Sequence, residues 1–124
     1  MYINFNANPI GKQVGDCVIR AISKVTNQEW ATTYAELAVQ GYLMCDMPSS
    51  NSVWSSYLKE QGFKRHIVPD TCPSCYTVKD FCREHPQGTY LLSLDKHVVA
   101  IIDGDYYDTF DSGNETVIYF FERN

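Results

Sequence analysis

The chain has 124 residues, which is enough for one domain with its own hydrophobic core and too few for two ordinary domains. Hydrophobic residues make up 44% and charged residues 20%, a balance that argues against an intrinsically disordered or fibrous chain. The formal net charge of −5 argues against a nucleic-acid partner, because affinity for a phosphate backbone comes largely from Lys and Arg.

Two features bear on the cellular compartment. Residues 1–6 lack the basic region and apolar run of a secretory signal, and no stretch is long and apolar enough to span a bilayer. The five cysteines are an odd number, and the apolar content suffices for a core, so reduced thiols are expected. The sequence therefore predicts a cytoplasmic protein with no membrane partner.

Apolar residues at three- and four-residue spacing predict four helices in the first two thirds of the chain. The first begins at Cys17, with Asp16 as its N-cap. The second follows a capping-box sequence at 26–29 and is expected to fray at Gly41, and Thr77 is expected to cap the fourth. In chain order, the expected helices are 17–25, 30–41, 53–61 and 78–84.

After the fourth helix, short runs rich in β-branched, aromatic and aliphatic residues predict strands. Asp103-Gly104 lies between two of these runs and favours a two-residue hairpin turn, which needs positive φ at both central positions. Helices followed by antiparallel strands predict an α+β fold, with residues 1–124 as a single domain. The expected strands are 90–94, 97–102, 106–110 and 117–121.

Cys17 is the candidate nucleophile. The first turn of a helix offers unpaired backbone N–H groups and the positive end of the helix dipole. Both favour a thiolate, and the same N–H groups can stabilise an oxyanion. The alternative is an ordinary buried cysteine, which is the more frequent fate of a free thiol.

His97 is the candidate general base. It opens a predicted strand, where an imidazole can face a neighbouring helix terminus and take a proton. The alternative is a histidine exposed at the end of a strand. The interpretation as a base therefore depends on Cys17 and on a carboxylate partner.

The hairpin register predicts which carboxylate that is. With a two-residue turn at Asp103-Gly104, Asp108 shares a face with His97 and lies diagonal to it. Asp111 then falls on the opposite face, although a bulged turn would bring it to His97, and this alternative stays open. A charge that keeps an edge strand soluble is the other interpretation of Asp108.

Three segments carry a family resemblance. Gly15-Asp16-Cys17-Val18-Ile19-Arg20-Ala21, the run 97–104 and the run 107–111 are similar to small papain-like proteins of gut bacteria and their phages. This resemblance covers nearly the whole chain, whereas the likeness of 108–110 to the Asn-Ser-Trp segment of papain is local. It implies a papain-like fold, with N-terminal helices packed against a C-terminal antiparallel sheet and with Cys17, His97 and Asp108 as the triad.

One position departs from the papain pattern. Papain-like enzymes place a glutamine six residues before the cysteine to complete the oxyanion hole, and this chain has Gly11 there. Gln13 is the nearest candidate for that role, at a different spacing. Three explanations stay open for this departure. The loop before Cys17 spans a shorter distance, backbone N–H groups form the oxyanion hole, or activity is weak.

Cys72-Pro73-Ser74-Cys75 is the competing constellation, because this spacing suits half of a zinc site or a redox pair. A second pair is missing, and only the scattered Cys45, Cys82 and His66 could complete four ligands. The acidic residues near the C-terminus do not have the spacing of an EF-hand. We therefore expect turn residues with incidental thiols, and no metal or other cofactor.

The expected reaction is acyl transfer to water, on a peptide or isopeptide bond of a peptide or protein substrate. Two alternatives stay open. One is a cell-wall peptidase of the NlpC type, in which the third group is usually another histidine. The other is a non-catalytic papain-like module, such as a phage structural or host-interaction protein.

Overall fold

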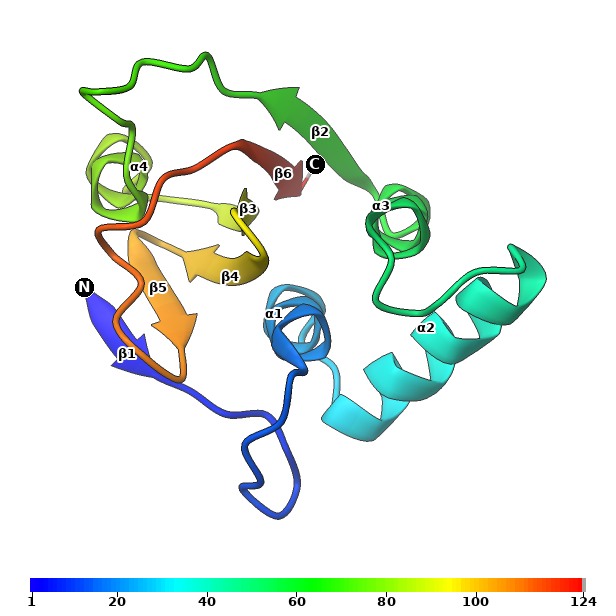
Figure 1. Cartoon of the computed structure of the whole chain (residues 1–124). Coiled ribbons are helices and arrows are strands. Elements are labelled where there is room, and N and C mark those ends of the chain that lie inside the picture. The colour runs from blue at the N-terminus through cyan, green and yellow to red at the C-terminus, as the bar shows by residue number, and fades with distance from the viewer. Residues whose placement is uncertain (124) are drawn as a thin grey trace.

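Four helices and a six-stranded mixed sheet form the α+β fold of the computed structural model, which describes residues 1–123 (Figure 1). None of the described helices is long and apolar enough to cross a membrane. The elements in chain order are β1 (Tyr2–Asn4), α1 (Cys17–Thr26), α2 (Trp30–Leu43), α3 (Asn51–Glu60), β2 (Phe63–Ile67), α4 (Val78–Glu84), β3 (Thr89–Leu94), β4 (His97–Ile102), β5 (Asp105–Asp108) and β6 (Tyr119–Arg123).

The sheet has the strand order β1-β5-β4-β3-β6-β2, and β1 runs parallel to β5 while the other neighbours are antiparallel. The prediction of a purely antiparallel, C-terminal sheet was therefore wrong. The two outer strands of the sheet, β1 and β2, precede α4 in the chain and so lie outside the predicted C-terminal set. Both are edge strands: β1 has only three residues, and β2 is mostly exposed, so neither has the apolar pattern that predicts a strand.

The β4–β5 hairpin has the predicted register. Ile102 pairs with Asp105, and the two turn residues Asp103 and Gly104 have φ values of 51° and 80°. A two-residue turn needs positive φ at both positions, which Asp tolerates and Gly adopts freely. The confirmed register brings the end of β5 alongside the start of β4.

The end of β5 and the start of β6 differ from the prediction. β5 ends at Asp108, two residues early, and the next N–H, that of Thr109, donates to the Asp108 side chain instead of to a strand. β6 begins at Tyr119 because the residues before it pair elsewhere: Thr116 forms a bridge with Thr77. A local side-chain contact therefore ends β5, and the bridge to Thr77 precedes β6.

The start of α1 confirms the predicted first residue, Cys17, and corrects the role of Asp16. Asp16 occupies the N-cap position, but its side chain makes no capping hydrogen bond. The carboxylate instead accepts from Arg20, one turn later, and from the indole N–H of Trp30. Two side-chain donors have replaced the backbone N–H groups as its partners.

The expected capping box at 26–29 does not form. Asn27 takes the left-handed conformation that ends α1, with φ of 55°, and Thr26 donates to the carbonyl of Ile22 within that helix. α2 begins directly after Glu29, which occupies the N-cap position but makes no capping hydrogen bond with its side chain. By contrast, the predicted cap of α4 is confirmed, since Thr77 and Asp80 form a complete capping box.

Gly41 does not mark a frayed end, because α2 continues to Leu43 and Gly41 is buried within it. A Cβ atom at this position would lie 2.7 Å from the backbone oxygen of Asp46 and 3.1 Å from the nitrogen of Pro48. The missing side chain therefore lets the loop after α2 fold back onto the helix. That loop later forms part of the cavity wall.

The sheet is covered on both faces (Figure 1). On one face α1, α2 and α3 enclose a core around the buried Trp54, Leu91 and Phe121. On the other face α4 packs Phe81 against a second core that includes Val99. Because both faces are buried, most residues of β3 and β4 are apolar, and apolar residues do not alternate with polar ones.

Candidate active site

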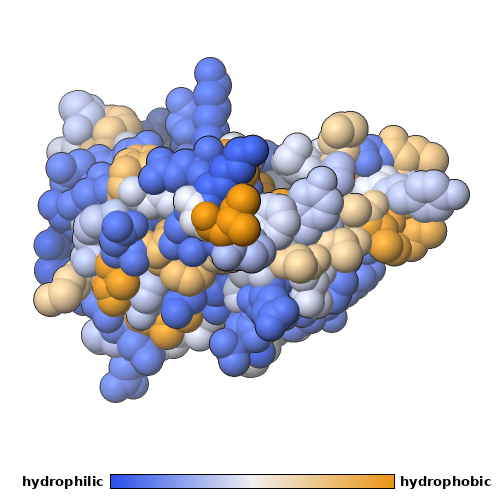
Figure 2. Space-filling model, turned by 90° about the horizontal axis from the view of Figure 1, so that it is seen from below, coloured by the Kyte–Doolittle hydropathy of each residue, from blue (hydrophilic) through white to orange (hydrophobic). Residues whose placement is uncertain are grey.

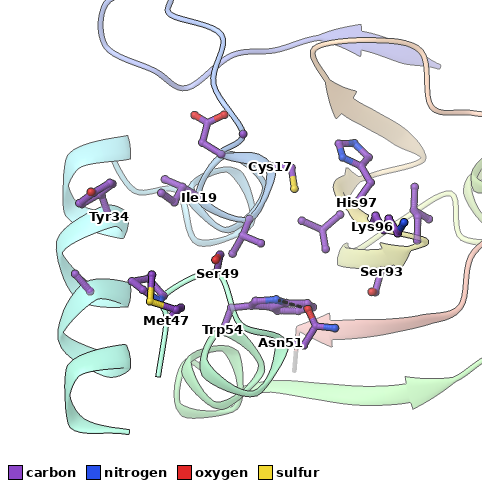
Figure 3. Close-up of a pocket in the computed structure, with 17 residues that line it drawn as sticks. Cys17, Ile19, Tyr34, Met47, Ser49, Asn51, Trp54, Ser93, Lys96 and His97 are labelled. Atoms are coloured by element: carbon purple, nitrogen blue, oxygen red, sulfur yellow. Dashed lines mark hydrogen bonds between the residues drawn. The ribbon is translucent and has the colours of Figure 1, made fainter. Parts of the chain in front are cut away.

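Cys17 is the first residue of α1 and is half-buried. In Figure 3 its sulfur points from the start of the helix toward His97, across the space between α1 and β4. The backbone N–H groups of the first helical turn have no partners within the helix. The thiol therefore lies where both an imidazole and free N–H donors are close.

His97 is the first residue of β4 and follows the tight turn at Lys96, which has a φ of 57°. Its Nε2 lies 2.6 Å from Oδ2 of Asp108. Its ring also lies against Phe110, with 5.0 Å between the ring centroids. The imidazole is therefore held on two sides, and Nδ1 is the ring nitrogen that Asp108 does not occupy.

The pKa values of Cys17 and His97 shift in opposite directions. Burial alone would lower the pKa of His97, but hydrogen bonds to Asp108 and to the Cys17 thiol raise it to about 9. Burial alone would raise the pKa of Cys17, but the hydrogen bonds from His97 and from the backbone of Val98 and the positive charges of His97 and Arg20 lower it. Each group therefore stabilises the charged form of the other, as a thiolate and an imidazolium.

Asp108 is buried and accepts hydrogen bonds on both carboxylate oxygens. Oδ2 accepts from His97 and, at 2.8 Å, from the hydroxyl of Ser112. Oδ1 accepts from the backbone N–H of Thr109 at 2.8 Å and lies 3.5 Å from Nη2 of Arg20. A carboxylate held by this many donors has one orientation, and it presents Oδ2 to the imidazole.

Asp111, the open alternative, lies elsewhere. It is exposed, and its Oδ1 accepts from the Tyr106 hydroxyl at 2.5 Å and from the N–H of Gly113 at 3.0 Å. These two donors lower its pKa. The structure thus brings Cys17, His97 and Asp108 together and leaves Asp111 out.

Gln13 is not brought to this group. It is exposed in the loop before α1 and is not among the residues that line the cavity beside Cys17. The position of Gln13 offers no support for a role as oxyanion donor. The backbone N–H groups of the first turn of α1 remain as candidate donors to an oxyanion.

A cavity of about 450 Å³ opens beside Cys17 and His97, between α1, the loop 47–51 and the turn before β4 (Figure 3). Its apolar wall includes Tyr34, Met47 and Trp54, and the Trp54 N–H is held by Asn51. Lys96 lines the opposite side. A substrate bound here would lie beside the Cys17 sulfur.

The apolar wall continues onto the outer surface. Apolar side chains gather at the end of the molecule where α2 and the loop after it project (Figure 2). They include the exposed Val39, Leu43, Met44 and Met47. A ligand longer than the cavity would find apolar surface there.

Sequence reasoning did not identify Arg20, Trp30 or Ser112 as part of this site. Arg20 contacts both Asp16 and Asp108, Trp30 donates to Asp16, and Ser112 donates to Asp108. The four-residue spacing of Asp16 and Arg20 on a helix was a usable signal for one ion pair. The contacts of Arg20 with Asp108 and of Trp30 with Asp16 join residues 88 and 14 positions apart, so no helical or strand pattern predicts them. Ser112 lies four residues after Asp108, but in the irregular segment beyond β5, where no repeating spacing applies.

The expectation of reduced thiols was wrong for Cys72 and Cys75, which form a disulfide. Two side-chain bonds close the turn that brings them together: Asp70 accepts from the N–H of Cys72, and Thr71 donates to the carbonyl of Ser74. The other three cysteines are free thiols. Within residues 1–123, no three His, Cys, Asp or Glu side chains are grouped so that they could hold a metal ion.

Comparison of the chain with models of known protein families, with curated proteins and with solved structures found no match.

Proposed function

We propose that this chain is a cysteine hydrolase with a papain-like fold, in which Cys17 is the nucleophile, His97 the general base and Asp108 the residue that orients His97. The observation that carries the proposal is the 2.6 Å contact between His97 Nε2 and Asp108 Oδ2. Because the Nε2–H is donated to the carboxylate, Nδ1 remains for the thiol proton. The raised pKa of His97 and the lowered pKa of Cys17 support the same arrangement.

Acylation then proceeds in two steps. The proton of the Cys17 thiol moves to Nδ1 of His97, and the thiolate attacks an amide carbonyl carbon to form a C–S bond. The carbonyl oxygen becomes an oxyanion, which backbone N–H groups at the start of α1, including that of Cys17, stabilise. The C–N bond breaks as His97 returns its proton to the leaving amine, and a thioester remains on Cys17.

Deacylation repeats the sequence with water. His97 takes a proton from the water, the resulting oxygen nucleophile attacks the thioester carbon, and the C–S bond breaks. The proton returns to the Cys17 sulfur, and the second product is a carboxylic acid. The carboxylate of Asp108 stabilises the imidazolium whenever it forms.

Peptide or isopeptide bonds are the proposed substrates, on the strength of the family resemblance. The cavity beside Cys17 fits this class, because it has room for a large side chain and an apolar wall that includes Met47 and Trp54. The partner is therefore a peptide or protein and not a nucleic acid. Location in the cytoplasm is part of the proposal, and the Cys72–Cys75 disulfide is the observation against it, because disulfides persist mainly in oxidising compartments.

One observation favours a non-catalytic papain-like module. Gln13 is exposed and away from the cavity, so no glutamine side chain is available for the oxyanion hole. A cell-wall peptidase of the NlpC type is less well supported, because the group in contact with His97 is the carboxylate of Asp108 and not another imidazole.

Hydrolysis assays distinguish the three functions. Native protein and Cys17→Ala are incubated separately with casein and with peptidoglycan, and released amines are measured. We expect release from casein by the native protein and none by Cys17→Ala. Release from peptidoglycan alone would favour the cell-wall enzyme, and release from neither substrate would favour the binding module.

A further inference from the structure

We propose that Arg20 is a positioning residue, which holds the start of α1, and with it Cys17, against Asp108, the partner of His97. The proposal rests on the proposed function, because it concerns the same reacting pair. Arg20 is not in the triad and does not line the cavity. Its role follows from what its guanidinium contacts.

Arg20 joins three segments with one side chain. Nη1 donates to Oδ1 of Asp16, the residue directly before Cys17, and lies 3.5 Å from the carbonyl of Val14 in the preceding loop. Nη2 lies 3.5 Å from Oδ1 of Asp108, at the end of β5. The segment that carries the thiol is thereby connected to the carboxylate that holds the imidazole.

All three charged side chains in this connection are buried. The side chain of Arg20 is 9% exposed, that of Asp16 is 4% exposed and that of Asp108 is 2% exposed. A buried charge is stable only when it is paired with good geometry, and here one guanidinium is shared by two buried carboxylates. The remaining oxygen of Asp16 accepts from Trp30 at 2.8 Å, which fixes the other side of the same carboxylate.

An arginine suits this place better than a lysine. Its planar fork can donate in two directions at once, whereas an ammonium group is a single point of charge on a flexible stem. The cation also has an electrostatic effect, since its charge is one of the causes that lower the pKa of Cys17. Other charged groups act from the elements around the thiol: Asp16 before α1, Lys96 and His97 at the start of β4, and Asp108 on β5.

The test compares Arg20→Lys and Arg20→Met with a matched control, Arg123→Met. Arg123 also contacts α1, but at its other end, where it donates to the carbonyl of Val25. The rate at which iodoacetamide alkylates Cys17 is measured from pH 5 to 9 by peptide mapping, and urea unfolding reports stability. This readout needs no substrate, and a purely structural role would change only stability.

At the acid end of this range, where the thiolate is the minor form, we expect Cys17 in both Arg20 variants to be alkylated about tenfold more slowly, because loss of the bridge raises the pKa of Cys17. Arg123→Met is expected to match the native chain. If Arg20→Met loses its fold, Arg20→Lys decides the question, since it keeps the charge but cannot bridge both carboxylates.

Three results would overturn the role of Arg20. In the first, both variants fold and alkylate Cys17 with the native pH dependence; in the second, Arg20→Lys alone does so. In the third, both variants lose the fold. The last would assign Arg20 to stability only. A native chain in which Cys17 titrates as an ordinary thiol would instead contradict the proposed function. The two failures are therefore distinguishable.

Discussion

His97 Nε2 and Asp108 Oδ2 lie 2.6 Å apart, which joins the first residue of β4 to the last residue of β5. The hairpin between these strands turns on two residues only, Asp103 and Gly104. A turn of this length fixes the register, so the contact between imidazole and carboxylate is set by the backbone. His97 therefore needs no further movement to have its ring oriented.

This contact predicts the effect of Asp108→Asn. The asparagine has nearly the same shape, but it removes the negative charge that stabilises the imidazolium and no longer fixes the tautomer of His97. We expect the turnover number for peptide hydrolysis to fall about 10²-fold or more, with the fold retained. Steady-state kinetics and circular dichroism check the two parts.

Asp111→Asn is the matched control for this substitution. The amide oxygen can still accept from the Tyr106 hydroxyl and from the N–H of Gly113, so we expect activity within about threefold of the native value. A large loss of turnover in Asp111→Asn, with little loss in Asp108→Asn, would transfer the orienting role to Asp111.

Cys17→Ala is predicted to change how stability depends on pH. The pKa of His97 is raised from 6.5 to about 9, so its contribution is fully present below pH 6.5 and is lost as pH rises through about 9. The pKa of Cys17 is lowered from 9.0, so its contribution is present above pH 9 and is lost as pH falls through the lowered value. In the native chain these two trends oppose each other between pH 6.5 and 9.

Without the thiol, only the trend from His97 remains, since Asp108 still raises its pKa. We therefore expect the free energy of unfolding of Cys17→Ala to fall between pH 6.5 and 9 more steeply than that of the native chain. Urea unfolding at these two pH values measures the difference. If the free energy of unfolding depends on pH in the same way in both proteins, Cys17 and His97 do not stabilise each other's charged forms.

The elements with strong local signals were predictable from the sequence. β4 has the predicted bounds, 97–102, because a continuous apolar run ends at a clear turn signal. α1 begins at the predicted residue, Cys17, because apolar spacing and a polar residue before it agree. The hairpin register was enough to predict that Asp108 lies beside His97, whereas the approach of Cys17 to this pair was an expectation from the family resemblance.

Contacts between distant segments could not be predicted in this way. β1 is three residues long and becomes a strand only by pairing with β5. The approach of Arg20 to Asp108 joins residues 88 positions apart. The Cys72–Cys75 disulfide depends on the geometry of one turn, whereas composition indicates only the average state of the thiols.

Thiol counting tests the disulfide. Denatured protein is titrated with a thiol reagent before and after treatment with a reductant. We expect three reactive thiols, those of Cys17, Cys45 and Cys82, before reduction and five afterwards. Five thiols in the untreated protein, purified without reductant, would show that Cys72 and Cys75 are not joined.

Gly41→Ala is predicted to destabilise the protein, although alanine favours helices. The added Cβ would meet backbone atoms of Asp46 and Pro48, at 2.7 and 3.1 Å, and these cannot move aside as a side chain could. We expect the free energy of unfolding to fall by about 1–3 kcal/mol, as for other overpacked sites.

Gly15→Ala is the control for this substitution, because nothing lies within 4 Å of its Cβ position. Urea unfolding of both variants checks the comparison. Equal stability of Gly41→Ala and the native chain would mean that the loop after α2 does not rest on the helix as described.

The most direct test of the thiolate–imidazolium pair is the order in which the free thiols of the native protein are alkylated at low pH. The protein is treated with iodoacetamide at several pH values from 5 to 8, and each cysteine is quantified by peptide mapping. Burial raises the pKa of Cys82 to about 11, and Cys45 is exposed. We predict that Cys17 is labelled first at every pH, and that His97→Ala abolishes this lead. Labelling of Cys45 ahead of Cys17 in the native protein, with Cys17 protected, would contradict the assignment of the nucleophile.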